Sequence, residues 1–185
     1  MVIAENGYVL VSLFRRRERR RAVRNAFERI VERARDPFFY AELGVPDTLD
    51  GRFELLALHA FLVLSRLRRD HAETAGFSQA LFDAMFADLD RGLREMGVAD
   101  LGVGRRVQAM ARGFYGRIAA YERGLVDADA LVPALRRNLY GTVHPTPTQL
   151  VAAAAYIRDQ VAALVGQSAA SLMAGDIHFA LLEAT

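Results

Sequence analysis

The hydrophobic pattern of the chain centres on one stretch, residues 46–69. Between Leu55 and Leu64 the single polar side chain is His59, so this segment is apolar on every side. A helix with no polar face is buried in a core or in a membrane, and ten residues rise only about 15 Å, which is too short to cross a bilayer. Pro46 ends the preceding element, and Thr48 or Asp50 can cap the first turn. The pattern therefore predicts a central buried helix from Thr48 to Arg69.

Apolar residues recur at helical spacing along the rest of the chain as well. Asp36-Pro37 ends one helix, Gly97 and Gly124 end two others, and Thr146-Pro147-Thr148-Gln149 is a capping box that starts a long last helix. The predicted fold class is all-α, a single domain of about six helices around the helix of residues 48–69. The other helices are expected over residues 15–35, 78–96, 107–121, 127–139 and 146–172, with residues 71–76 as a polar loop.

The chain divides into three expected parts. Residues 1–14 are expected to form a flexible or extended segment before the first helix. Within it, residues 8–13 have a pattern of side chains that is typical of a β-strand. Residues 15–35 form an arginine-rich amphipathic helix, and residues 36–185 form the helical domain. A chain of 185 residues with 52% hydrophobic side chains is large enough to bury its own core.

Composition narrows the classes of function. The sequence contains no cysteine, which excludes disulfides, zinc–thiolate sites and a cysteine nucleophile. No stretch approaches the roughly 20 consecutive apolar residues of a transmembrane helix. The apolar run of residues 8–14 precedes the arginines, the reverse of a secretory signal. We therefore expect a cytoplasmic protein, and peripheral attachment to the inner membrane stays open.

Charge is distributed unevenly. Residues 15–35 contain ten arginines and three glutamates, a local net charge of +7, whereas the whole chain carries +2 and the remainder therefore −5. Such a segment can bind nucleic acid, anionic lipid or an acidic protein, or simply form a solvated face. No helix-turn-helix follows, so DNA is not the expected partner. The residues predicted to contact a membrane surface or a ribosome are Arg15, Arg16, Arg17, Arg19, Arg20 and Arg21.

The sequence carries few candidates for chemistry. A lone histidine in an apolar run, as at His59, is usually a hydrogen-bonded core residue, although axial haem ligation is an alternative. Asp83, Asp88 and Asp90 lie on a predicted solvated face, where residues two apart diverge and do not form a metal cluster. We expect no catalytic residue, no metal site and no cofactor, and hence a protein that is not an enzyme.

Several short motifs occur together in a specific order. The first is Asp47-Thr48-Leu49-Asp50-Gly51-Arg52-Phe53-Glu54, followed by Leu58-His59 and Ser65-Arg66-Leu67-Arg68. Later come Phe86-Ala87-Asp88, Phe114-Tyr115, Tyr121-Glu122-Arg123-Gly124-Leu125 and Leu172-Met173-Ala174-Gly175-Asp176-Ile177-His178-Phe179. In this order the chain resembles the ubiquinol–cytochrome c chaperone family, as a bacterial-type member. The family-motif positions are Asp47, Gly51, Phe53, His59, Arg66, Asp88, Tyr121, Gly124 and Gly175.

The resemblance implies an assembly chaperone for the respiratory cytochrome bc complex (complex III). Members of the family bind newly made cytochrome b while haem is inserted, and the mitochondrial ones act with a small partner protein near the ribosomal tunnel exit. The chain has Arg52 where mitochondrial members have Trp, and we expect it to lack their long N-terminal extension and hydrophobic anchor. The resemblance therefore does not carry over their membrane attachment or their partner protein.

A chaperone for an apolar client needs an apolar groove. Met and Phe adapt to varied partners, so the sequence predicts Phe82, Met85, Phe86 and Met96 as one wall of a client site, although a core position is the favoured interpretation for each residue taken singly. Two other functions stay open. One is a helical ligand-binding regulator with its arginine-rich segment on nucleic acid, and the other is an enzyme using haem or quinone.

Overall fold

The computed structural model describes residues 3–97 and 100–182, all of them in helices, turns or loops, with no strand among them. The helices are α1 (Ile3–Ala34), α2 (Phe38–Ala41), α3 (Leu49–Arg68), α4 (His71–Glu95), α5 (Asp100–Val126), α6 (Ala128–Arg137), α7 (Pro147–Val165) and α8 (Ala169–Met173). The predicted all-α class is confirmed.

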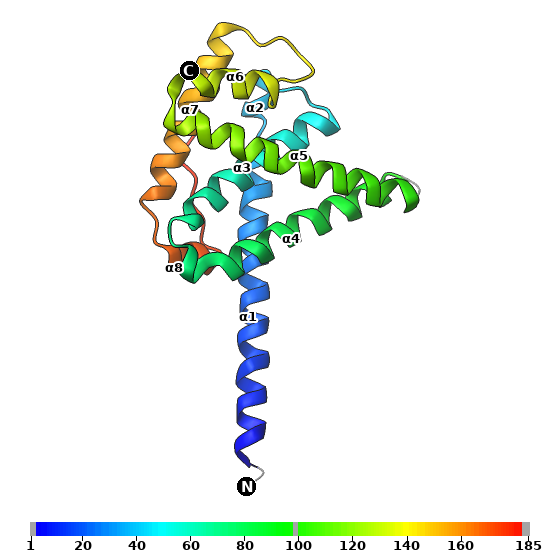
Figure 1. Cartoon of the computed structure of the whole chain (residues 1–185), viewed down its shortest axis with the longest axis vertical. Coiled ribbons are helices and arrows are strands. Elements are labelled where there is room, and N and C mark those ends of the chain that lie inside the picture. The colour runs from blue at the N-terminus through cyan, green and yellow to red at the C-terminus, as the bar shows by residue number, and fades with distance from the viewer. Residues whose placement is uncertain (1–2, 98–99, 183–185) are drawn as a thin grey trace.

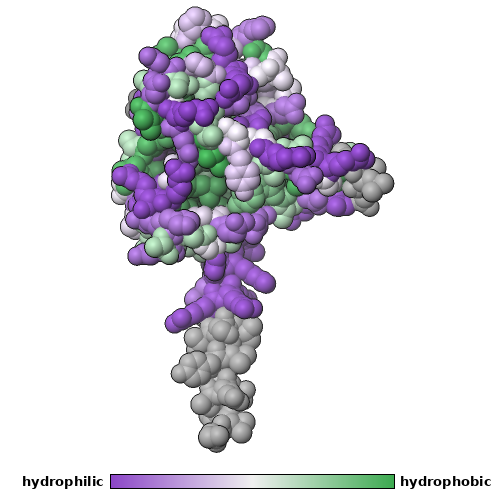
Figure 2. Space-filling model, in the orientation of Figure 1, coloured by the Kyte–Doolittle hydropathy of each residue, from purple (hydrophilic) through white to green (hydrophobic). Residues whose placement is uncertain are grey.

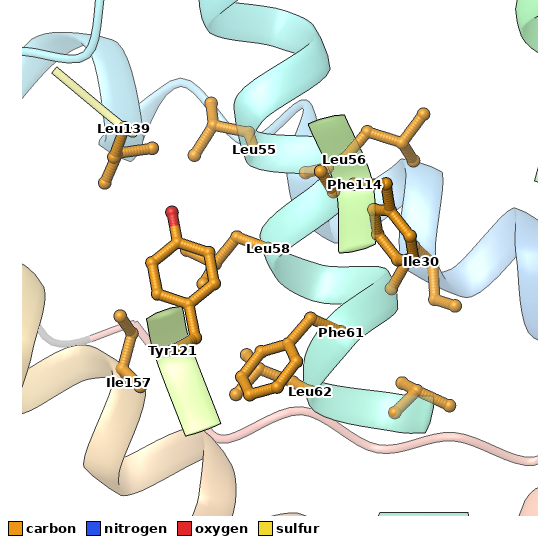
Figure 3. Packing of buried hydrophobic residues seen from close by; sticks show 14 of the residues in the cluster. Ile30, Leu55, Leu56, Leu58, Phe61, Leu62, Phe114, Tyr121, Leu139 and Ile157 are labelled. Atoms are coloured by element: carbon orange, nitrogen blue, oxygen red, sulfur yellow. The ribbon is translucent and has the colours of Figure 1, made fainter. Parts of the chain in front are cut away.

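The central position of α3 is confirmed too. It packs against α1, α4, α5 and α7, and all residues from Phe53 to Val63 are buried. Burying an apolar side chain contributes roughly 1.5–3 kcal/mol, so the apolar residues of this run contribute substantially to stability. Figure 3 shows how side chains of α3 meet Ile30 of α1, Tyr121 of α5 and Ile157 of α7.

The start of α3 is built as the sequence predicts. The Thr48 hydroxyl accepts a hydrogen bond from the Gly51 amide at 3.1 Å. A Cβ at Gly51 would lie 2.0 Å from the Pro46 carbonyl oxygen, so only glycine lets the preceding loop lie this close to the helix.

Helix α1 is longer than predicted. Its C-terminal half docks on the domain as expected, with Val23, Ile30 and Ala34 buried. Its N-terminal half runs back to Ile3 and projects from the body as a single rod (Figure 1), so the flexible or extended lead-in of residues 3–14 was wrong. The first two residues of that lead-in lie outside the described part of the chain. Adding residues to a helix that has already formed costs little, so α1 continues from the predicted helix of residues 15–35 back through residues 3–14.

Two other boundaries differ from the prediction. The expected loop of residues 71–76 is the first part of α4, where the Thr74 hydroxyl donates to the Leu67 carbonyl at 2.7 Å. The expected long last helix is divided, because α7 ends before Gly166 and the Ser168 side chain caps α8. The capping box of Thr146 and Gln149 at the start of α7 is confirmed.

Helices α4 and α5 extend beyond the body as an antiparallel arm, seen on the right of Figure 1. At its base, α5 is followed directly by α6, which Asp127 caps and which packs closely on α5. A large open hollow lies in the angle between this arm and the start of α3.

Candidate functional site

An open groove of about 990 Å³ lies between the start of α3, the end of α1 with α2, and the outer half of α4. Its lining is mostly apolar. Leu49 and Met96 stand at the groove with 41% and 56% of their surfaces exposed. The lining residues are Val31, Ala34, Arg35, Pro37, Tyr40, Ala41, Asp47, Leu49, Arg52, Phe53, Leu56, Asp88, Leu89, Gly92, Leu93, Met96 and Met110.

Charged side chains edge this groove and are largely paired with one another. Asp47 Oδ1 accepts from Arg52 Nε at 2.6 Å, and this hydrogen bond lowers the pKa of the Asp47 carboxyl. Asp88 accepts from Arg91 at 2.6 Å. Burial raises the pKa of the Tyr40 phenol, which also lines the groove. The groove thus has an apolar floor and a rim whose carboxylates are already satisfied.

A smaller hollow of about 380 Å³ continues the groove toward α6. Leu49, Phe53, Leu93 and Met110 line both hollows, so the two form one surface. The smaller hollow is more polar, and it contains three arginines and two acidic residues. They are Arg106, Arg117, Arg137, Asp50 and Glu54.

A buried ion pair fixes the wall of the smaller hollow. Arg117 of α5 binds both carboxylate oxygens of Glu54 of α3, with 2.6 Å between Arg117 Nε and Glu54 Oε2. Only 8% of Glu54 is exposed, and this hydrogen bonding raises the pKa of Arg117. The guanidinium also lies 5.3 Å from the centre of the Phe53 ring. This planar bidentate contact holds the arm against the start of α3.

The four predicted client-binding residues are not brought together on one wall. Met85 and Phe86 are buried in the core. Phe82 is half-buried, with its ring 4.6 Å from Phe86, and it does not line the groove. Met96 does line it. A helix stripe predicts which residues face inward, but not which of them end at an opening between helices, so a client role for the four residues stays a prediction.

His59 is a core residue. Its side chain has no exposed surface, Nδ1 lies 2.7 Å from the Leu55 carbonyl and Nε2 lies 2.6 Å from the Tyr156 hydroxyl. Burial lowers the pKa of His59 to about 4, so the ring is neutral. The pattern fits one tautomer, in which Nδ1–H donates to the carbonyl and Nε2 accepts from the phenol. With both nitrogens engaged, the arrangement favours the core role over haem ligation.

The family-motif residues divide between the groove and the core. Asp47, Phe53 and Asp88 line the groove, and Gly51 lines its continuation. The others shape helix contacts elsewhere. Arg66 donates to the Gln167 carbonyl at 2.7 Å, Tyr121 is fully buried, Gly124 lies against Leu131, and Gly175 (φ +85°) lies against α1.

The arginine-rich cluster of residues 15–21 is fully exposed. All six arginines project from α1 just outside the body, where Figure 2 shows a hydrophilic collar. Arg19 donates to the Gly76 carbonyl, and Arg15, Arg19 and Arg21 line a hollow beside Glu73 of α4. Among the described residues, no three His, Asp or Glu side chains are placed to hold a metal ion, and no helix of residues 3–97 and 100–182 is long and apolar enough to cross a membrane.

Sequence reasoning missed several residues of the groove. Leu49, Leu93 and Met110 come from three helices, and Arg106 and Arg137 from two. A signal existed for Leu49, because an apolar residue directly after the Thr48 cap falls outside the helix's buried run. The others carried no local signal, since their proximity depends on how α4, α5 and α6 cross α3.

Comparison with known proteins now decides the family. The model of the ubiquinol-cytochrome C chaperone family matches residues 41–179 of the 185. The chain belongs to this family. The resemblance stated from the motifs is thereby confirmed.

Relatives in the family share both sequence and fold with the chain. It is 27% identical to the ubiquinol-cytochrome-c reductase complex assembly factor 1 of Xenopus laevis over 71% of its length and 66% of that protein's. It is 26% identical to the Mus musculus protein of the same name, over 66% of its own length and 42% of the other's. The chain thus spans between two fifths and two thirds of these curated relatives.

The crystal structure of the Cbp3 homolog from Brucella abortus is similar to almost the whole chain. The TM-score is 0.80 at 38% identity, and the match covers 92% of this chain and 96% of that one. The helical architecture that forms the groove therefore extends to an experimentally determined relative.

Proposed function

We propose that the protein is an assembly chaperone of ubiquinol–cytochrome c reductase that binds newly made cytochrome b through the groove at the start of α3. The observation that carries the proposal is the groove itself. It exposes Leu49 and Met96 beside the family-motif residues Asp47, Phe53 and Asp88, in a chain that belongs to the chaperone family. An apolar groove between helices suits an apolar helix of a client that has not yet reached its final place.

The test is co-isolation of cytochrome b with the chain after synthesis of the client in a cell-free system. Leu49→Glu and Met96→Glu should reduce the co-isolated cytochrome b several-fold, because each places a charge on an apolar contact surface. Val151→Glu is the matched control, since Val151 is also an exposed hydrophobic residue but lies on α7, outside the groove. Equal recovery with all three variants would contradict the groove as the client site.

The role in assembly has its own readout. Membranes of a strain lacking the gene should lose the haem b and haem c absorbance of the bc complex in a reduced-minus-oxidised spectrum, while the oxidases keep theirs. Complementation with the Val151→Glu variant should restore the bands, and the Leu49→Glu/Met96→Glu pair should not. An unchanged spectrum in the deletion strain would contradict the assembly function.

The exposed arginine collar supports a second proposal, attachment to an anionic membrane surface. The six arginines lie on a helix that projects from the body, and the acidic side chains near them in the described residues are Glu18 of the same segment and Glu73 of α4. Each basic residue near an anionic surface contributes about 1 kcal/mol, so six can hold the protein there. A ribosomal surface would attract the same collar.

Co-sedimentation distinguishes the two partners. Replacing Arg15, Arg16, Arg17, Arg19, Arg20 and Arg21 with Gln should abolish binding to vesicles containing anionic lipid, and binding by the unaltered chain should weaken steeply with salt. Replacing the exposed Arg112, Arg123 and Arg136 with Gln is the control. Binding of the unaltered chain to ribosomes but not to vesicles would assign the collar to RNA. If the six-arginine variant bound both as the unaltered chain does, the collar would contact neither partner.

A further inference from the structure

The groove and its continuation differ in charge, and the difference selects among possible occupants. At the edge of the large groove Asp47, Arg52 and Asp88 are engaged in ion pairs, and in the small hollow Arg117 is engaged by Glu54. Three exposed arginines of the lining have no ion-pair partner among the described residues. They are Arg35 in the large groove, and Arg106 and Arg137 in the small hollow.

The small hollow offers an anion more than these two arginines. The first turn of α3 lines it, and the N-terminus of this 20-residue helix carries a partial positive charge.

One acidic group remains to oppose an anion. Asp50 lines the hollow and forms no ion pair in the described residues. It is exposed in the first turn of α3, where it faces the helix dipole. Arg106 and Arg137 together outweigh it, so the hollow keeps a positive balance.

From this arrangement we infer that the groove takes an apolar polypeptide segment that ends in a carboxylate-bearing residue, with the carboxylate held between Arg106 and Arg137. The inference rests on the proposed client groove and adds the polarity of its occupant. Leu49, Phe53, Leu93 and Met110 provide the continuous apolar floor that joins the two hollows. Charge at an interface selects partners and fixes their register more than it adds affinity, so the arginines would set the direction in which the segment lies.

Two synthetic peptides test the inference against the full chain by fluorescence anisotropy. Both have the same short apolar helical sequence, and one ends in two Glu residues where the other ends in two Gln residues. The Glu peptide should bind about fivefold more tightly at low salt, the size expected for two or three partly exposed ion pairs, and the preference should shrink in high salt.

Variants locate the source of the preference. Arg106→Gln with Arg137→Gln should abolish the preference and leave the affinity for the Gln peptide unchanged. The control pair is Arg112→Gln with Arg136→Gln, exposed arginines on the same two helices outside the lining, and it should keep the preference. Arg106→Glu with Arg137→Glu should favour a third peptide that ends in two Lys residues.

The outcomes separate this inference from the proposed function. Equal binding of the Glu and Gln peptides to the unaltered chain, or loss of the preference in the control pair, would overturn the carboxylate site while leaving the groove intact. If Leu49→Glu changed the affinity of neither peptide, the groove itself would be wrong. Loss of both peptides in Leu49→Glu, with the arginine pair affecting the Glu peptide alone, supports both.

Discussion

Nε2 of His59 lies 2.6 Å from the hydroxyl of Tyr156, and this hydrogen bond joins the middle of α3 to α7 inside the core. The rings of Phe39 and Phe179 pack at their edges, with centroids 5.2 Å and 5.6 Å from that of His59. Four segments of the chain therefore meet at one neutral imidazole. His59, a family-motif residue for which axial haem ligation was an alternative, therefore stabilises the fold.

The buried imidazole predicts that stability depends on pH. The pKa of His59 falls from 6.5 to about 4 on folding, chiefly because burial disfavours the charged ring. The unfolded chain therefore binds more protons than the folded one between these values, and stability falls as the pH drops from about 6.5 toward 4. The total loss is about 3 kcal/mol.

Urea unfolding at several pH values measures this loss. His59→Asn keeps a polar side chain but cannot titrate, so its stability should change less over the same range, even though it is lower at pH 7. If the unaltered chain and the variant show the same pH dependence, other groups cause the acid sensitivity.

Removing the phenol hydroxyl should destabilise the same core. Tyr156→Phe leaves the His59 Nε2 acceptor buried without a partner, at a cost of about 1–3 kcal/mol. The substitution removes no charge at neutral pH, because burial raises the pKa of Tyr156 and the phenol is already uncharged. Thermal unfolding at pH 7 measures the difference, and Tyr115→Phe is the control, since Tyr115 is 60% exposed. Equal stability of both variants would contradict a stabilising role for the bond.

Two glycines of α5 should respond oppositely to alanine. A Cβ at Gly124 would lie 2.7 Å from the Leu131 Cα atom, where α6 packs closest, so Gly124→Ala should cost about 1–3 kcal/mol. A Cβ at Gly116 would meet nothing within 4 Å. Gly116→Ala should therefore stabilise the chain by up to about 1 kcal/mol through helix propensity. Denaturant midpoints of the two variants measure the contrast, and a destabilised Gly116→Ala would show that α5 packs differently.

The Glu54–Arg117 pair should matter more than the surface pairs. Arg117→Gln leaves a nearly buried carboxylate without its partner and should cost about 2 kcal/mol, since part of the arginine reaches solvent. Adding Glu54→Gln removes the orphan charge and should recover part of the loss. Arg94→Gln is an exposed control on α4, with an expected change below about 0.5 kcal/mol. A double variant less stable than Arg117→Gln alone would contradict this account.

The sequence predicted the helices whose core face or first turn is marked by neighbouring residues. The apolar run without a polar face predicted the continuous burial of residues 55–63. Thr48 and Thr146 were predicted as caps because their hydroxyls can accept hydrogen bonds from the free amides of a first turn. The prediction of a loop at residues 71–76 was wrong. Gly76 and Thr74 suggested a loop, yet the Thr74 hydroxyl bonds the Leu67 and Asp70 carbonyls and lies inside α4.

The sequence by itself determined the all-α class, the central helix, the separation of charge and the family motifs, because each depends on residues close together in the chain. The tertiary structure alone decided where the groove lies. Leu49, Met96 and Arg106 are distant in sequence and meet only because α4 and α5 leave the body as an arm beside the start of α3. It also decided that Met85 and Phe86 are core, since a helical stripe shows which side faces inward but not where the covering helices end.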